Sequence, residues 1–171
     1  MKEYRIQKLY DDDHFTEIFQ ITQIKDNKVI LTVRPKDGNL LDTLKSKLKK
    51  ELLVYSGYLK QEIGVLRSNI GLSSVWKMVL KGKEVAKAEI KGVQYFTVKI
   101  TDGKQGFSGK TTDLNEIELI KGRDFSSCAF STRQDKNDKL DLLIKLDCKV
   151  SPEALLTFGV ALDNKFLFDS E

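Results

Sequence analysis

The residue types that carry catalysis are sparse in this chain. His14 is the only histidine, and no nucleophile-elbow motif accompanies it, so the sequence offers no catalytic triad. Gly103, Gly106 and Gly109 recur at intervals of three, but they fall on an expected hairpin, whereas glycine loops that bind phosphate precede a helix. Asp113, Glu116 and Glu118 are typical of an ordinary polar segment. We therefore expect no catalytic residues, no cofactor and no enzymatic activity.

Metal-ligating residues are equally few. Cys128, Cys148 and His14 lie far apart and lack the paired spacing of zinc sites. We expect the two cysteines to be reduced thiols in the core, with a disulfide as the alternative if their strands lie side by side. The run Asp11-Asp12-Asp13 lacks the pattern of a calcium loop and is interpreted as a solvated loop. The sequence therefore predicts no metal site.

Composition places the chain among soluble globular proteins. It has 171 residues, of which 40% are hydrophobic and 32% charged, with a net charge of +4. Its apolar runs fall short of the roughly 20 residues that span a bilayer, and its first residues contain no signal-peptide core. We expect no membrane association and a cytoplasmic location, or a nuclear one in a eukaryote. The mild basic excess is compatible with nucleic-acid binding but does not by itself indicate it.

The first third of the chain is typical of strands and one helix. Alternating apolar residues at 17–23 and a β-branched run at 28–34 flank Asp26-Asn27, which predicts a hairpin. Residues 4–9 suit a further strand. Asn39 is a suitable helix N-cap, and apolar residues then follow at three- and four-residue spacing, which predicts an amphipathic helix continuing toward residue 69. The members of this stripe are Leu40, Leu41, Leu44, Leu48, Leu52, Tyr55, Ile63 and Leu66.

The rest of the chain suggests a second unit. Small and polar residues at 70–74 mark a boundary. Strands are expected at 77–90 with a bend at Gly82, and at 95–101, 107–111, 125–132 and 140–150. One or two helical turns are expected at 114–120. The tail from Ser151-Pro152 onward is expected to begin with a short helix and then either to pair as a last strand with the N-terminal sheet or to recruit a partner.

Three phrases of this second unit resemble OB-fold domains. They are Val85-Ala86-Lys87-Ala88-Glu89, then Tyr95 to Gly103 with its alternating pattern and terminal Asp-Gly, then Ile120-Lys121-Gly122-Arg123-Asp124 before a strand. The pattern is similar to OB modules of replication and tRNA-handling proteins, including bacterial replicative polymerases, and covers about residues 75–150. The resemblance implies a five-stranded barrel. The expected fold is therefore α+β: an N-terminal β-hairpin and amphipathic helix at 1–72, an OB-like β-barrel at 73–151 and a tail at 152–171.

The same resemblance implies a nucleic-acid-binding face across the second and third barrel strands and the adjacent loops. The candidates on this sequence are Lys87, Lys91, Tyr95, Lys99, Phe107, Lys110, Arg133 and Lys136. Two alternatives stay open: Phe107 in the barrel core, and Tyr95 packed against the N-terminal helix. Trp76 is expected to pack between domains.

Two functions follow from these expectations. The first is binding of single-stranded DNA or RNA, accessory to replication, repair or mobile-element DNA processing. The alternative is a non-catalytic docking subunit, in which the barrel and the helical stripe contact a protein partner or a second copy of the chain through Leu40, Leu44, Leu48 and Leu52.

Overall fold

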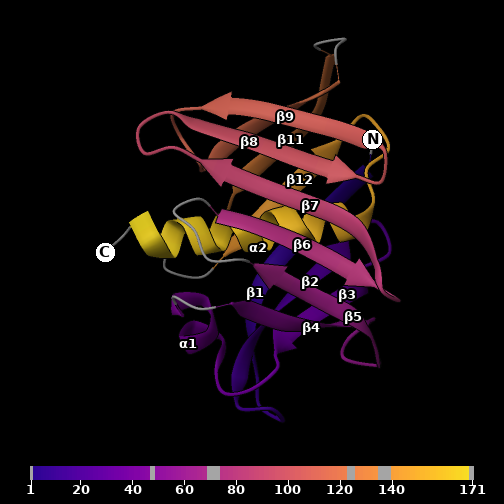
Figure 1. Cartoon of the computed structure of the whole chain (residues 1–171). Coiled ribbons are helices and arrows are strands. Elements are labelled where there is room, and N and C mark those ends of the chain that lie inside the picture. The colour runs from indigo at the N-terminus through magenta and orange to yellow at the C-terminus, as the bar shows by residue number, and fades with distance from the viewer. Residues whose placement is uncertain (1, 47–48, 69–73, 123–125, 135–139, 170–171) are drawn as a thin grey trace.

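The computed structural model of the chain describes residues 2–46, 49–68, 74–122, 126–134 and 140–169 (Figure 1). These residues form twelve strands and two helices: β1 (Lys2–Asp11), β2 (Thr16–Gln23), β3 (Lys28–Pro35), α1 (Leu40–Lys45), β4 (Lys50–Ser56), β5 (Gln61–Ser68), β6 (Ser74–Leu80), β7 (Lys83–Lys91), β8 (Phe96–Asp102), β9 (Gln105–Thr111), β10 (Glu116–Lys121), β11 (Ser126–Arg133), β12 (Asp141–Leu146) and α2 (Pro152–Asp169).

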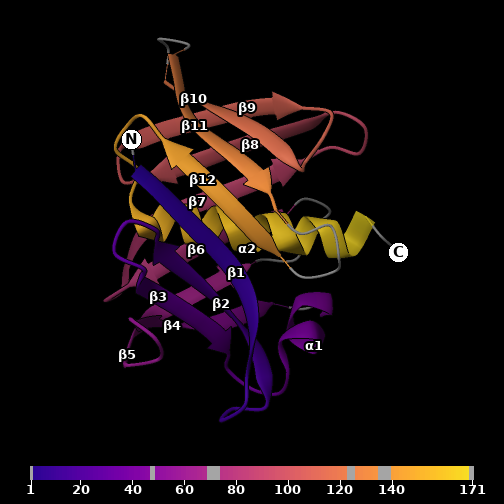
Figure 2. The same cartoon turned by 180° about the vertical axis from the view of Figure 1, so that it is seen from behind.

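The strands form a single closed antiparallel barrel. Each strand pairs with its neighbour in the sequence, and β12 pairs with β1 to complete the ring. This closure is visible from behind in Figure 2, where β12 lies beside β1. A closed ring leaves no sheet edge with unpaired backbone groups.

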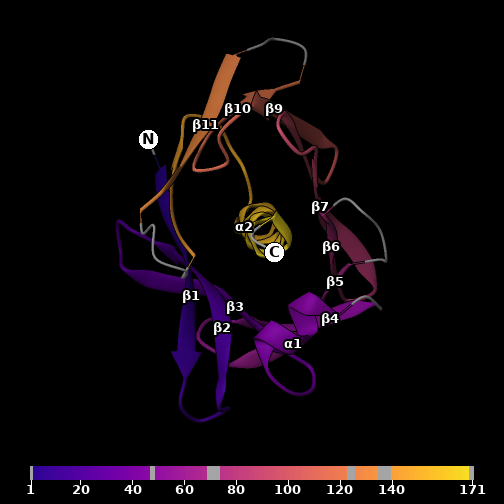
Figure 3. The same ribbon diagram turned by 90° about the vertical axis from the view of Figure 1, so that its left-hand side faces the viewer.

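Helix α2 fills the centre of the barrel. Figure 3 looks along its axis and shows the strands surrounding it on all sides. Residues 154–165 are all buried, and the helix carries apolar residues around its whole circumference, as expected for a helix with no solvent-facing side. It packs most closely against β6 and β7, where Ala86 and Ala88 point inward and leave room for it. On β1 the approach is also close, because a Cβ at Gly159 would lie 2.9 Å from Ile6 Cγ2.

The start of α2 is capped by its own chain and by β8. Ser151 Oγ accepts a hydrogen bond from the Ala154 amide at 3.2 Å, and Pro152 follows as the first helical residue. Asp102 at the end of β8 accepts hydrogen bonds from the Ser151 amide and hydroxyl, both at 2.8 Å. The barrel wall thus fixes where the helix enters.

The expected five-stranded OB barrel is wrong. Strands from both halves of the chain belong to the one twelve-stranded ring and share one core, so a division at residue 72 separates two parts of the same sheet. Residues 69–73, which include most of the expected boundary, lie outside the described residues, but β5 and β6 on either side of them pair directly.

The expected long amphipathic helix is also wrong. Asn39 does cap a helix, but α1 ends at Lys45, and the chain then continues as β4 and β5. Leu52 and Leu66 point into the barrel from these strands, because their apolar spacing also fits the two-residue period of a strand. Leu40, Leu44 and Leu52 are fully buried and Leu48 lies outside the described residues, so the three described leucines of the expected interface belong to the core, whereas Leu41 of the same stripe is 47% exposed.

Three smaller differences concern local structure. The expected strand at 77–90 is two strands, because Lys81 and Gly82 both have positive φ and form a two-residue hairpin turn. The segment at 114–120, expected to contain helical turns, contains β10 instead. The tail forms the central helix and not a strand. The hairpin of β2 and β3 is confirmed.

Candidate binding face

The barrel interior contains charged groups, and one oppositely charged pair joins the wall to the central helix. Lys8 Nζ on β1 lies 2.8 Å from Asp163 Oδ2 on α2, and both side chains are almost fully buried. Burial raises the pKa of Asp163, and the Lys8 ammonium opposes that rise. This ion pair holds the C-terminal half of α2 to the barrel wall.

Asn164 on α2 connects three further elements. Its Oδ1 accepts hydrogen bonds from Trp76 Nε1 on β6 and from Lys50 Nζ on β4, each at 3.2 Å. Its Nδ2 donates to the Leu44 carbonyl of α1 at 3.2 Å. Trp76 is therefore a core residue that contacts the central helix, and not an inter-domain packing residue.

Lys50, beside Asn164, has a pKa well below that of an ordinary lysine. Burial lowers its pKa to about 8, because the ammonium form loses hydration inside the barrel. An amine with such a pKa is a possible nucleophile or base, but Lys50 is only 7% exposed and donates to Asn164. With α2 filling the interior, we assign these polar groups to anchoring the helix.

The outer surface of the barrel carries a different arrangement. Arg67 on β5, Lys77 on β6 and Lys87 on β7 are direct cross-strand partners, Arg67 opposite Lys77 and Lys77 opposite Lys87. Their sequence neighbours point into the core, so these three side chains share the outer face. Neighbouring strands are only about 4.8 Å apart, and like charges placed directly opposite destabilise a sheet.

Few counterions offset this row. Arg67 Nε lies 4.0 Å from Glu51 Oε1, whereas no described residue forms an ion pair with Lys77 or Lys87. The opposite side of the barrel differs, because there Arg5 donates two hydrogen bonds to Asp141, at 2.9 and 2.6 Å. Within the described part of the chain, Lys77 and Lys87 thus lack the kind of counterion that Arg5 has.

Further lysines extend the row across β7 to β9. Lys91 Nζ lies 2.6 Å from Glu89 Oε1, and Lys99 is the cross-strand partner of Glu89. The pKa of Glu89 is lowered chiefly by the hydrogen bond from Lys91, with smaller contributions from the charges of Lys87 and Lys99. Lys110 on β9 is exposed and pairs with Thr97, which faces outward beside Lys91. We call the outer face that carries Arg67, Lys77, Lys87, Lys91, Lys99 and Lys110 the ladder face.

An exposed aromatic residue lies at the edge of the ladder face. Tyr95 is 79% exposed in the loop between β7 and β8, directly before Phe96, the cross-strand partner of Thr111. Gly92 shapes this loop, because it has φ +115° and a Cβ there would lie 1.8 Å from the Tyr95 carbonyl oxygen. The loop thus presents Tyr95 at the end of the strands that carry Lys91 and Lys110.

The residues expected from sequence divide into two groups. Lys87, Lys91, Lys99 and Lys110 lie together on the ladder face, with Tyr95 at its edge, although on a different barrel from the one expected.

Of the other three expected residues, the two that the structure describes do not join them. Phe107 is 3% exposed and belongs to the core, as the alternative expectation had it, so its outward placement is wrong. Arg133 lies on β11, where its guanidinium stacks 4.3 Å above the Phe166 ring of α2. Lys136 lies outside the described residues.

Arg67 and Lys77 were missed by sequence reasoning. Both were assigned to elements that do not exist as expected, Arg67 to a helix and Lys77 to the first strand of a separate barrel. The available signal was weak, because each cation is the only charged residue of its segment, 64–68 and 75–79 respectively: Arg67 lies between Leu66 and Ser68, and Lys77 lies between Trp76 and Met78, all four of which are buried.

The described residues contain no group of three or more His, Cys, Asp or Glu side chains arranged to hold a metal ion. At the tip between β1 and β2, Asp11 Oδ2 lies 2.7 Å from His14 Nδ1. Neither described helix combines the length and the hydropathy of a membrane-spanning segment. Comparison with family models, curated proteins and solved structures finds no match to this chain.

Proposed function

We propose that this chain is a non-catalytic binding protein whose ladder face binds single-stranded DNA or RNA. The observation that carries the proposal is the direct cross-strand register of Arg67, Lys77 and Lys87. Three like charges in register raise the free energy of the empty sheet, and a bound row of phosphates would offset that repulsion. The filled interior supports the same conclusion, since it directs ligand binding to the outside of the barrel.

Two features favour a single strand over other phosphate-bearing ligands. A single strand presents unstacked bases, and Tyr95 offers an exposed ring on which a base can stack. Phosphates follow one another along a strand, as the cations do across the sheet. The proposed location is the cytoplasm, or the nucleus of a eukaryotic cell, where single strands are exposed during replication and repair.

The test is a fluorescence anisotropy titration with labelled oligonucleotides over a range of salt concentrations. The logarithm of the affinity should fall linearly with the logarithm of the salt concentration, with a slope of about −0.7 per phosphate contact. The variant Lys77→Gln/Lys87→Gln removes two contacts and should flatten the slope by about 1.4. The matched control Lys28→Gln/Lys145→Gln removes two exposed lysines on β3 and β12 and should leave the slope unchanged.

Tyr95→Ala separates stacking from charge. The ring is largely exposed, so its loss should barely change stability, but should weaken binding by about 1–3 kcal/mol with an unchanged salt slope.

Vesicles of anionic phospholipid form the comparison arm, because they also present phosphates. Binding to vesicles through Lys77 and Lys87, together with no binding to oligonucleotides at low salt, would overturn the nucleic-acid proposal. If the wild-type protein binds oligonucleotides but the ladder-face variant and the control variant lose affinity equally, the assignment to the ladder face would be overturned.

A further inference from the structure

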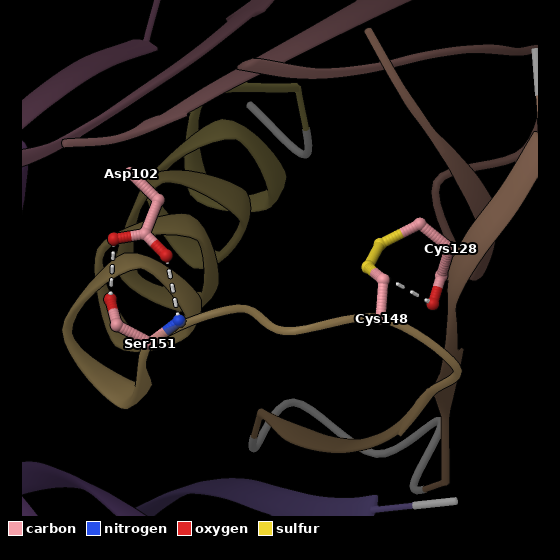
Figure 4. The surroundings of a disulfide bond; sticks show 4 residues. All are labelled: Asp102, Cys128, Cys148 and Ser151. Atoms are coloured by element: carbon pink, nitrogen blue, oxygen red, sulfur yellow. Dashed lines mark hydrogen bonds between the residues drawn. A yellow bond between two sulfur atoms is a disulfide. The ribbon is translucent and has the colours of Figure 1, made fainter. Parts of the chain in front are cut away.

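Two cysteines meet where the barrel wall leads into the central helix. Cys128 on β11 and Cys148, two residues beyond β12, form a disulfide with a Cα–Cα distance of 5.1 Å (Figure 4). The expectation of two reduced thiols is therefore wrong, and the alternative, a disulfide between neighbouring segments, is confirmed. Backbone pairing holds the two segments together, because the Asp147 amide donates to the Cys128 carbonyl at 2.8 Å.

The two cysteines differ in exposure. Cys128 is only 2% exposed, whereas Cys148 is partly exposed. Cys148 also lines an open cavity of about 400 Å³, formed together with Lys2, Leu146, Asp147, Lys149 and Val150. A small molecule that enters this cavity therefore reaches Cys148 first.

The charges of the cavity favour one class of small thiol. Two lysines, Lys2 and Lys149, and one acidic residue, Asp147, line the cavity, which leaves an excess of one positive charge. A peptide thiol with a net negative charge is attracted to such a cavity, and a cationic thiol is not. Glutathione has that charge and a size suited to the volume.

We propose that Cys148 is a thiol–disulfide exchange site for an anionic peptide thiol of the glutathione class, with Cys128 as the buried resolving cysteine. The thiolate of the peptide attacks Cys148 Sγ, the bond to Cys128 breaks, and the Cys128 thiolate takes a proton from water. A second thiolate then releases Cys148, so two peptide thiols are oxidised to one disulfide while the protein disulfide is reduced to two thiols.

The reverse sequence re-forms the bond. In a reducing compartment such as the proposed cytoplasm, persistent disulfides are rare and those present are usually catalytic or redox-sensing. The position fits that role, because the cysteine-bearing segment continues directly into Ser151, which Asp102 holds at the start of α2 (Figure 4).

The first experiment measures the rate of mixed-disulfide formation by intact mass after acid quenching, with oxidised glutathione as the probe. In Cys128→Ser, Cys148 should gain one glutathione. In Cys148→Ser, the buried Cys128 should react at least about tenfold more slowly. Wild-type protein, first reduced, should pass to the intramolecular disulfide with little mixed disulfide. Equal rates in the two variants, or wild-type protein that keeps two thiols, would overturn the proposal.

The second experiment tests the charge preference in the Cys128→Ser background. Cystamine, a cationic disulfide, serves as the comparison probe. Lys2→Gln/Lys149→Gln should lower the rate with oxidised glutathione relative to that with cystamine by roughly threefold or more. Circular dichroism confirms that each variant is folded. An unchanged ratio of the two rates would overturn the assignment of an anionic thiol.

Discussion

Removing the cation of the buried Lys8–Asp163 pair should destabilise the protein strongly. The two charged atoms lie 2.8 Å apart, with side chains only 7% and 4% exposed. Lys8→Met keeps the length of the side chain but leaves the Asp163 carboxylate without its ammonium partner. Breaking a pair this deeply buried costs about 3 kcal/mol or more, which lowers the folding equilibrium constant by roughly two orders of magnitude.

The assay is urea unfolding at pH 7 followed by fluorescence. Trp76 is the only tryptophan, is fully buried and contacts α2 through Asn164, so its emission reports on the seating of the helix. The double variant Lys8→Met/Asp163→Leu replaces both charges with apolar groups and should recover most of the lost stability.

The pH dependence adds a second check on the same variant. Burial already raises the pKa of Asp163, and removing Lys8 raises it further. The folded variant then binds more protons than the unfolded chain at acidic pH, so the loss of stability should be smaller at pH 5 than at pH 7. A loss below about 1 kcal/mol at pH 7, or no recovery in the double variant, would refute the reasoning.

Three further changes probe how α2 is held. Lys50 has a pKa of about 8 in the folded chain, so the folded state binds fewer protons than the unfolded state above that pH, and wild-type stability should rise by about 2 kcal/mol between pH 8 and pH 10. Lys50→Met should be more stable than wild type at pH 7, and urea titrations should show no such rise in its stability between pH 8 and pH 10. Parallel curves of stability against pH for the two proteins would contradict this prediction. Gly159→Ala should lower stability by about 1 kcal/mol despite its better helix propensity, because the new methyl group meets Ile6, and thermal unfolding measures the shift. Asp102→Ala should cost about 1–2 kcal/mol of unfolding free energy, because the Ser151 amide loses its acceptor, and a midpoint equal to that of wild type would exclude the cap.

The local patterns of the sequence predicted more than the overall architecture. The β2–β3 hairpin and the strands near β8, β9, β11 and β12 follow from alternation between turn signals. The number of strands in the ring does not follow from such local signals, because it depends on whether β12 reaches β1. That pairing joins residues about 140 positions apart, such as Tyr4 and Ile144.

The central helix was hidden for a different reason. A helix buried on every side has no polar stripe, so residues 154–162 lack the amphipathic period that identifies helices from sequence. The opposite error arose at 39–69, where leucines at three- and four-residue spacing suggested a helix, although Leu52 and Leu66 lie on strands. The spacing of a few apolar residues fits both periods, and pairing with neighbouring strands decided the outcome.

The ladder face was predicted in part. Four of its six residues, Lys87, Lys91, Lys99 and Lys110, were identified as candidates through the resemblance to OB-fold domains, as was Tyr95 at its edge. Arg67 and Lys77 were not, since cross-strand register depends on the positions of the turns and bulges between strands, including the shift between Met78 and Val79. Register, and not composition, aligns these cations.

Amide hydrogen exchange along α2 tests the central claim, that this helix permanently fills the barrel and leaves the outer face for ligands. The amides of residues 156–164 should exchange as slowly as those of the barrel strands. As urea is added, the free energy of exchange of these amides should fall in parallel with the free energy of global unfolding. Exchange of these amides at a low free energy that does not depend on urea would show that α2 leaves the barrel without unfolding it, and would contradict the account.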